Sequence, residues 1–205
     1  YVVIQCQSQE PSWSDDQVAE EVLPYAKILC DSVRSINPCT IPLFYMTWGR
    51  KNGDASNCPF VPAVCTYEGM DSVLRSNYLK MGYLNEAEVC GVGAVWNDLR
   101  KTSSALELYN ADESHPSYAG SMAAAYSFYS TILRKDPLEA DYRGSLSAAN
   151  LDSIRSSVKR VIYNQLDSFN VGVSNPSAQF AIEQEGCTVY LTANGNNKRY
   201  LWKLG

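Results

Sequence analysis

The chain has 205 residues, of which 45% are apolar, and its formal net charge is −5. This length suits one medium-sized domain with a substantial core, alone or with a small appendage. The acidic balance argues against nucleic acid and anionic membrane surfaces as partners, because both need clustered cations. No apolar run approaches the roughly 20 residues of a membrane-spanning helix, so no span is predicted.

Strands and helices alternate through the first 170 residues. Three segments rich in apolar and β-branched residues are predicted strands: 2–6, 41–47 and 89–95. Three segments with apolar residues at helical spacing are predicted helices: 18–36, 70–81 and 151–162. A further helix is expected to run from Pro116, in its first turn, to about Leu133. This alternation predicts a parallel sheet with helices on both faces.

Two features interrupt this pattern. Pro24 falls inside the first predicted helix, where it should kink or split it. Residues 49–66 are rich in Gly, Asn, Asp and Pro and are predicted to form a long loop that contains two cysteines. Loops of this length are usually functional, so this one is a candidate part of a site.

The pattern changes after about residue 170. Three short strand-like segments follow without a helix between them: 180–182, 187–192 and 200–202. A turn signal at residues 194–197 separates the last two. We therefore place a boundary near 170–176, between an α/β domain (1–170) and a β-rich segment (171–205). Three strands are marginal alone, so this segment should dock on the first domain or begin a larger sandwich.

The seven cysteines are many for a cytosolic protein of this size. Two pairs close short loops and could form disulfides in an oxidising compartment: Cys30/Cys39 and Cys58/Cys65. The alternative is buried free thiols, which suits Cys6 and Cys90 because both lie on apolar strands. No Cys-x-x-Cys motif occurs and the chain has a single histidine, so neither a metal nor another cofactor is predicted.

His115 is that single histidine, and Asp112 precedes it by three residues. A histidine is the usual general base near neutral pH, and a nearby carboxylate can fix its tautomer. The alternative is a helix-capping aspartate beside an exposed histidine.

Polar and aromatic residues follow each predicted strand. In an open α/β sheet, ligands bind beyond the carboxyl ends of the strands. The residues expected at that edge are Gln5, Gln7, Trp48, Arg50 and Trp96, with the Asp112–Pro116 segment reaching the same place.

The sequence Asp-x-x-His-Pro, followed by a helix of small residues, resembles the last conserved block of the SGNH/GDSL hydrolases. Four further segments resemble one bacterial-type branch of that superfamily and occur in the same order: Val2–Ser8, Thr47-Trp48-Gly49-Arg50, Thr66–Tyr78 and Val92–Trp96. This resemblance covers about residues 1–168.

The resemblance implies a three-layer, flavodoxin-like fold and hydrolysis of an ester by a serine nucleophile. It gives His115 the role of base and Asp112 the role of orienting it, and it places the oxyanion-binding amide at Gln7 or Gln5. Trp48 and Arg50 would shape a pocket for an acyl group or a sugar. The expected protein is a secreted, periplasmic or cell-surface esterase that acts on an acylated carbohydrate or a small ester and needs no cofactor.

The chain lacks the Gly-Asp-Ser block that carries the nucleophilic serine of this family. The family's Gly-Asp-Ser block precedes the strand at 2–6, and Gly53-Asp54-Ala55 has alanine in place of the serine. Four serines are candidates by proximity alone: Ser8, Ser114, Ser117 and Ser121. We expect an α/β domain that is incomplete at its N-terminus, with the serine upstream and an N-terminal fragment of the same precursor as a partner. Whether the chain is an enzyme depends on that block.

The alternative is a non-catalytic SGNH-like domain that serves as a structural, adhesive or glycan-binding module of a surface or fibrous protein. The tail favours such a setting. Residues 189–192 and 200–205 resemble the start of a PKD-like or related immunoglobulin-type sandwich.

Overall fold

A computed structural model of the chain describes residues 1–7, 9–172, 179–185 and 188–194, the last two ranges as backbone only. The chain divides into two units, Tyr1–Val173 and Ser174–Gly205.

A parallel sheet forms the centre of the first unit. Its strands are β1 (Val2–Ile4), β2 (Pro42–Tyr45) and β3 (Glu88–Cys90), in the order β1-β2-β3. Ile4 pairs with Phe44, and Phe44 pairs with Val89. The central strand is almost entirely apolar because both of its faces are buried. The predicted parallel α/β sheet is therefore confirmed, although each strand is shorter than expected.

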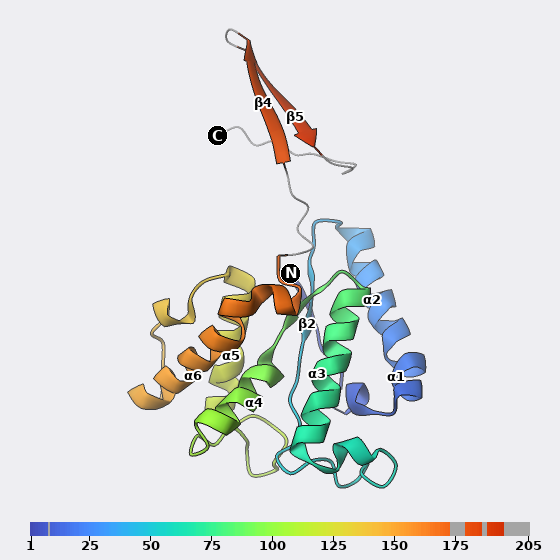
Figure 1. Cartoon of the computed structure of the whole chain (residues 1–205), viewed down its shortest axis with the longest axis vertical. Coiled ribbons are helices and arrows are strands. Elements are labelled where there is room, and N and C mark those ends of the chain that lie inside the picture. Colours follow the sequence, from blue (N-terminus) through green and yellow to red (C-terminus); the bar gives the residue numbers. More distant parts are fainter. Residues whose placement is uncertain (8, 173–178, 186–187, 195–205) are drawn as a thin grey trace. The chain divides into compact units, whose positions relative to one another are not determined.

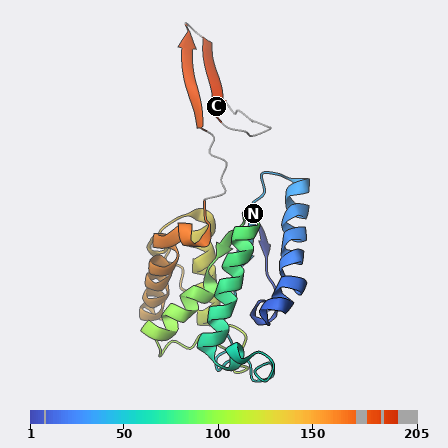
Figure 2. The ribbon, with the colours of Figure 1, turned by 45° about the vertical axis from the view of Figure 1, so that its right-hand side comes forward.

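Six α-helices surround this sheet in the described residues (Figure 1). They are α1 (Asp15–Glu21), α2 (Leu23–Ile36), α3 (Tyr67–Leu84), α4 (Val92–Thr102), α5 (Tyr118–Leu133) and α6 (Ala148–Val161). Short 3-10 segments lie at Glu10–Ser12, Pro62–Cys65, Pro137–Glu139 and Tyr163–Phe169. Figures 1 and 2 show α1 and α2 on the opposite side of the unit from α5 and α6.

Helices cover both faces of the sheet. Val89 approaches Gly82 of α3, while the thiol of its neighbour Cys90 accepts a hydrogen bond from Thr131 of α5. Successive side chains of a strand point to opposite faces, so α3 and α5 lie on opposite faces of β3. The result is the helix–sheet–helix layering that the alternating sequence pattern predicts.

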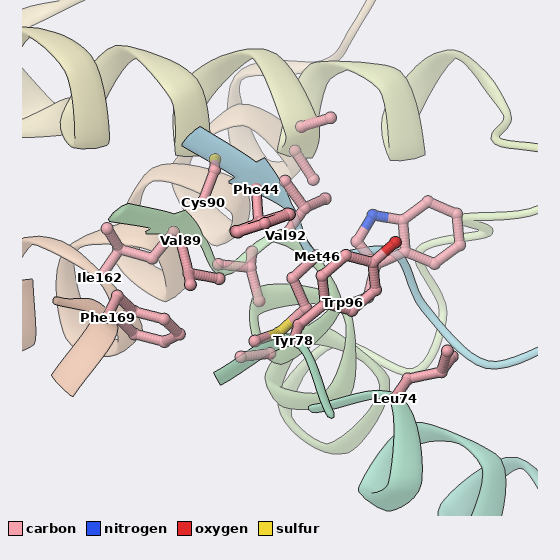
Figure 3. Close-up of a cluster of buried hydrophobic side chains, with 14 of the residues drawn as sticks. Phe44, Met46, Leu74, Tyr78, Val89, Cys90, Val92, Trp96, Ile162 and Phe169 are labelled. Carbon is pink, nitrogen blue, oxygen red and sulfur yellow. The ribbon is translucent and has the colours of Figure 1, made fainter. Parts of the chain in front are cut away.

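The core joins these layers (Figure 3). Phe44, Val89, Val92 and Trp96 are completely buried, together with Tyr78 of α3. No helix of the described residues is long and apolar enough to cross a membrane.

Proline and capping residues set the helix boundaries. Pro24 occupies the first turn of α2 and separates it from α1, so the predicted split is confirmed. The side chain of Ser117 accepts a hydrogen bond from the backbone of Gly120 and caps α5. Pro116 therefore precedes the cap and does not lie in the first turn, which corrects that expectation.

The predicted strand at 89–95 is wrong beyond Cys90. Gly91 caps α4, which takes up Val92–Thr102. A short apolar run cannot distinguish a buried strand from a buried helix by its period. Gly93 permits the close packing of this helix, because a β-carbon there would lie 2.1 Å from the carbonyl oxygen of Thr47.

One of the two predicted disulfides is confirmed. Cys58 and Cys65 are bonded within the long loop. Cys30 and Cys39 are free, because Cys30 is buried on the inner side of α2 while Cys39 is exposed beyond the end of that helix. Cys6 and Cys90 are also free. Cys90 is buried on β3, as its alternative interpretation requires, and burial raises the pKa of its thiol to about 12, whereas Cys6 is only partly buried and lies beyond the end of β1.

The second unit contains an antiparallel pair, β4 (Gln179–Glu185) and β5 (Thr188–Asn194). These strands correspond to the first two predicted in the tail. The third, around residues 200–202, and most of the predicted turn at 194–197 lie outside the described residues.

Candidate active site

A pocket of about 380 Å³ lies beyond the carboxyl ends of β1 and β2. It is lined by Gln5, Gln7, Tyr45, Thr47, Trp48, Arg50, Ser114, His115 and Pro116. Sheet topology explains the gathering, since parallel strands end at one edge. Of the seven predicted site residues, this lining includes Gln5, Gln7, Trp48, Arg50 and His115.

The segment that carries the histidine is a tight loop closed by backbone hydrogen bonds. Tyr109 and Pro116 form an antiparallel bridge, and the amide of Asn110 donates to the carbonyl of His115 over 2.8 Å. Glu113 adopts a left-handed conformation, with φ of 58°. This turn brings Asp112 and His115 to the same side.

Asp112 holds this loop and the imidazole ring together. Its Oδ1 accepts hydrogen bonds from the backbone amides of Ser114 (3.0 Å) and His115 (2.9 Å). Its Oδ2 lies 2.6 Å from Nδ1 of His115. In the neutral ring, an Nδ1–H that donates to this carboxylate leaves Nε2 as the basic nitrogen. The alternative role of Asp112 as a helix cap is wrong, because Ser117 caps α5.

The carboxylate remains charged over the whole neutral range. The amides of His115 and Ser114, followed by the imidazole, lower the pKa of Asp112 to about 2. The pair is open to solvent, with 76% of the His115 side chain and 50% of the Asp112 side chain exposed. A bound ligand would have to exclude water from it.

Two hydrogen bonds join the loop after β2 to the loop that carries His115. Trp48 donates from Nε1 to the carbonyl of Ser114 over 3.0 Å. The backbone amide of Lys51 donates to the carbonyl of Glu113 over 2.9 Å. These bonds fix the position of His115 relative to the floor of the pocket.

Trp96 does not line the pocket, which corrects its predicted place. It lies inside α4 and is fully buried. Its ring stacks on that of Trp48, with centroids 3.9 Å apart and planes 9° apart. Trp96 therefore supports the pocket wall from behind.

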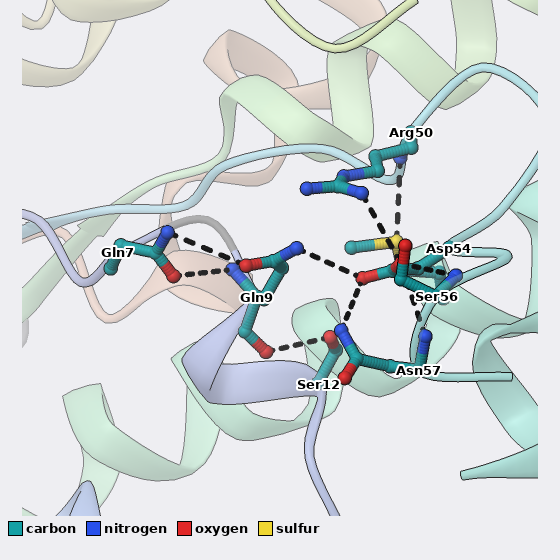
Figure 4. Close-up of polar contacts among 8 residues, drawn as sticks. Gln7, Gln9, Ser12, Arg50, Asp54, Ser56 and Asn57 are labelled. Atoms are coloured by element: carbon teal, nitrogen blue, oxygen red, sulfur yellow. Dashed lines mark hydrogen bonds and ion pairs between the residues drawn. The ribbon is translucent and has the colours of Figure 1, made fainter. Parts of the chain in front are cut away.

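Arg50 is anchored by a buried carboxylate that sequence reasoning missed. Its Nη1 lies 3.2 Å from Oδ1 of Asp54, which also accepts hydrogen bonds from Gln9 and Asn57 (Figure 4). Burial raises the pKa of Asp54, but the bonds from Asn57 and the charge of Arg50 outweigh it, so that this pKa lies below its usual value. The spacing of four residues between an arginine and an aspartate was the only available signal.

The candidate serines do not complete a triad in the described residues. Ser117 caps α5 and donates to the carbonyl of Glu107, and Ser121 is exposed on the same helix. Ser114 lines the pocket, but no hydrogen bond joins its hydroxyl to the imidazole. Ser8 lies outside the described residues.

No cluster of three or more His, Cys, Asp or Glu residues in the described ranges could hold a metal ion. The pocket residues instead offer hydrogen-bond donors, an imidazole and a guanidinium. This set can bind a polar ligand and move a proton.

Comparison with known proteins shows the fold but no family. No protein-family model matches the chain, and no curated protein matches it. Among solved structures, the chain is similar to a DUF4886 family protein from Bacteroides uniformis, with a TM-score of 0.62 and 15% identity. The match covers 78% of this chain and 61% of the other, so the chain spans about three-fifths of that protein's length. At this identity, the likeness supports the α/β fold alone.

Proposed function

We propose that this chain forms most of an SGNH-type serine esterase domain, secreted or exposed at the cell surface, which removes acyl groups from carbohydrate. The observation that carries this function is the contact of 2.6 Å between His115 Nδ1 and Asp112 Oδ2 at the edge of the pocket. A flavodoxin-like, three-layer fold of the SGNH type is consistent with the layered parallel sheet.

In this mechanism, Nε2 of His115 removes the proton from a serine hydroxyl as the oxygen attacks the ester carbonyl. The tetrahedral intermediate collapses, and His115 returns the proton to the departing alcohol. Water then hydrolyses the acyl-serine by the same two steps. Asp112 holds the ring and stabilises its charged form, and an amide of Gln5 or Gln7 would donate to the developing oxyanion.

The nucleophile in this proposal comes from a segment other than the residues described. β1 offers a place for it, because it is an edge strand of the described sheet, and Val2 and Val3 are 41% and 47% exposed. A strand paired there in parallel with β1 would end beside Gln5 and Gln7, at the same edge as the pocket. A serine directly after such a strand would lie near the imidazole.

The test uses the complete natural protein that contains this chain. Hydrolysis of p-nitrophenyl acetate and of acetylated xylan should fall at least about 100-fold in His115→Ala, because a general base contributes about 10²–10⁴. Ser76→Ala, at an exposed position of α3, is the matched control and should keep full activity. A fluorophosphonate probe should label one serine, which mass spectrometry would locate. Equal turnover in His115→Ala would contradict the proposal.

A second candidate function is a non-catalytic, glycan-binding or structural module. It is favoured by the fact that, among the described residues, the His115 ring has hydrogen-bond contact with Asp112 and with no serine. This function predicts that the protein binds carbohydrate without turnover. The affinity for carbohydrate should then be the same in His115→Ala as in the wild type. Fluorophosphonate labelling of a serine would exclude it.

A further inference from the structure

Arg50 is the only permanently charged residue among the described residues that line the pocket. The other lining residues are amides, hydroxyls, aromatic rings, a proline and His115. An arginine in such a place binds a planar anion well, because its guanidinium presents five N–H donors in a fixed plane.

The guanidinium is held in place and retains binding capacity. Asp54 contacts Nη1, while Nε is buried and donates no hydrogen bond to any described residue. Asp54 itself is fixed by Gln9 and Asn57, so it cannot swing away with the arginine. With 30% of the side chain exposed, part of the guanidinium faces the pocket while one end is anchored. Pre-positioning of this kind lowers the entropy lost on binding.

The charges select among anions. Asp54 already offsets part of the positive charge of Arg50, so a dianion such as phosphate would gain less from the arginine and meet more repulsion. A carboxylate carries one charge and matches the guanidinium in geometry. Trp48 and Tyr45 add aromatic walls that suit a sugar ring.

We propose that the pocket selects a carboxylate-bearing sugar ester, of the acetylated hexuronic acid class, by a charge-assisted contact between the carboxylate and Arg50. This substrate class rests on the proposed esterase function, but the carboxylate contact itself requires no catalysis. His115 would then act on the ester at the other side of the same pocket.

The kinetic experiment compares two substrates on the complete natural protein: mono-O-acetyl glucuronic acid and mono-O-acetyl glucuronamide, its uncharged counterpart. The wild type should prefer the acid at least about tenfold in kcat/KM, as expected for a charge-assisted hydrogen bond. Arg50→Gln should abolish this preference, so that kcat/KM for the acid falls to about the value for the amide in the same variant. Arg50→Lys should keep the ion pair with Asp54 and restore only part of the preference.

A binding experiment separates this inference from the esterase proposal. Titration calorimetry on His115→Ala compares glucuronate with glucuronamide, in the absence of turnover. Glucuronate should bind at least about tenfold more tightly, and Arg50→Gln in this background should remove the difference. This result would support the carboxylate site even if no ester is hydrolysed.

Two results would contradict the carboxylate site. Equal kcat/KM of the wild type for the two esters would overturn the carboxylate site and leave the esterase proposal standing. Equal affinity for glucuronate and glucuronamide would likewise overturn the carboxylate site, even if the protein hydrolyses no ester. Because both comparisons can be made without an Arg50 variant, a variant that fails to fold does not prevent the decision.

Discussion

The two oxygens of Asp112 have different tasks. Oδ1 accepts the backbone amides of Ser114 and His115, which shapes the loop, and Oδ2 contacts the ring, which orients it. Because the amides also lower the pKa of Asp112 to about 2, the bonds that build the loop keep the orienting group charged. Local structure and electrostatics thus come from the same three contacts.

Asp112→Asn separates these tasks. The amide oxygen can still accept both backbone amides, but its NH₂ group would face Nδ1 and favour the tautomer with the proton on Nε2. We expect kcat of the complete protein to fall about 100-fold or more, with little change in thermal stability. Steady-state kinetics and calorimetry measure the two effects.

Asp112→Ala is the matched control, since it removes both tasks and should lower stability as well as kcat. Because the pKa of Asp112 is lowered in the folded protein, the stability that its charged form contributes is lost at low pH and not at high pH. The contacts of its charged form are complete above about pH 4 and are lost only as the pH falls through about 2, so Asp112 itself does not titrate between pH 5 and 9 and these contacts persist across that range. A wild-type kcat in Asp112→Asn would refute the orienting role.

Trp48 positions the histidine loop through one hydrogen bond. Trp48→Phe keeps an aromatic wall and the stack on Trp96, but it removes the donor to the carbonyl of Ser114. Loss of a bond worth about 1 kcal/mol should lower kcat about fivefold to tenfold through displacement of His115. KM should stay within about twofold, as determined by initial-rate kinetics.

Tyr45→Phe provides the comparison for Trp48, because Tyr45 lines the same pocket and the change also removes one polar group from an aromatic ring. Its kcat should remain at the wild-type value. If both variants lose kcat equally, the loss comes from the lower polarity of the pocket and not from the missing hydrogen bond between Trp48 and Ser114.

The sequence allowed prediction of the residues at strand ends but not of those behind them. Gln5, Trp48 and Arg50 follow strands, and the edge of a parallel sheet brings such residues together. Asp54 could not be found in this way, because its role depends on the path of the loop that brings it under Arg50. Trp96 was misplaced for a related reason, since its helix was taken for the end of a strand.

At the level of elements, periodicity identified α3 and α6 but could not assign the region after β3. Residues 88–96 are buried without interruption, so neither a period of 2 nor one of 3.6 is visible there. The short connection from β3 to α4 depends on Gly91 and on Gly93, which packs against the carbonyl of Thr47. That contact is a tertiary feature and leaves no local signal in the sequence.

Asp71 of α3 forms a buried polar contact with α4. Asn97 donates to Oδ2 of Asp71 over 2.8 Å, and the hydroxyl of Tyr67 lies 3.4 Å from Oδ1. Burial raises the pKa of Asp71 to about 6, although the bonds from Asn97 and Tyr67 lower it in part. The folded state favours the protonated acid. The unfolding free energy of the protein should therefore fall as the pH rises from about 4 through 6, and the Asp71 carboxyl should cause no further change above that.

Asp71→Asn removes this pH dependence. A shift of about two units corresponds to about 3 kcal/mol, so the variant should gain up to about that much unfolding free energy relative to the wild type between pH 4 and pH 7. Urea unfolding at several pH values measures the difference. Ser72→Ala, at an exposed position of α3, is the control and should follow the wild-type curve. A constant difference between Asp71→Asn and the wild type across this range would contradict the raised pKa.

At the scale of the whole first unit, β1 and α2 both carry exposed apolar side chains. β1 is an edge strand of the described sheet, and its Val2 and Val3 are exposed. The adjoining α2 buries one stripe of apolar residues and exposes another: Tyr25, Ile28, Leu29 and Ile36. An open strand edge beside exposed apolar groups favours pairing with another chain.

We therefore expect the 205-residue chain by itself to associate as its concentration rises, and Val3→Lys to reduce this association. A lysine on an edge strand disfavours strand pairing because its charge would have to be buried. Ser76→Lys on α3 is the matched control, since both variants change the net charge from −5 to about −4. A net charge closer to zero should by itself favour association, so the two variants are expected to move in opposite directions. Sedimentation velocity at several concentrations measures this, and an equal effect of both lysines would show that β1 is not the contact surface.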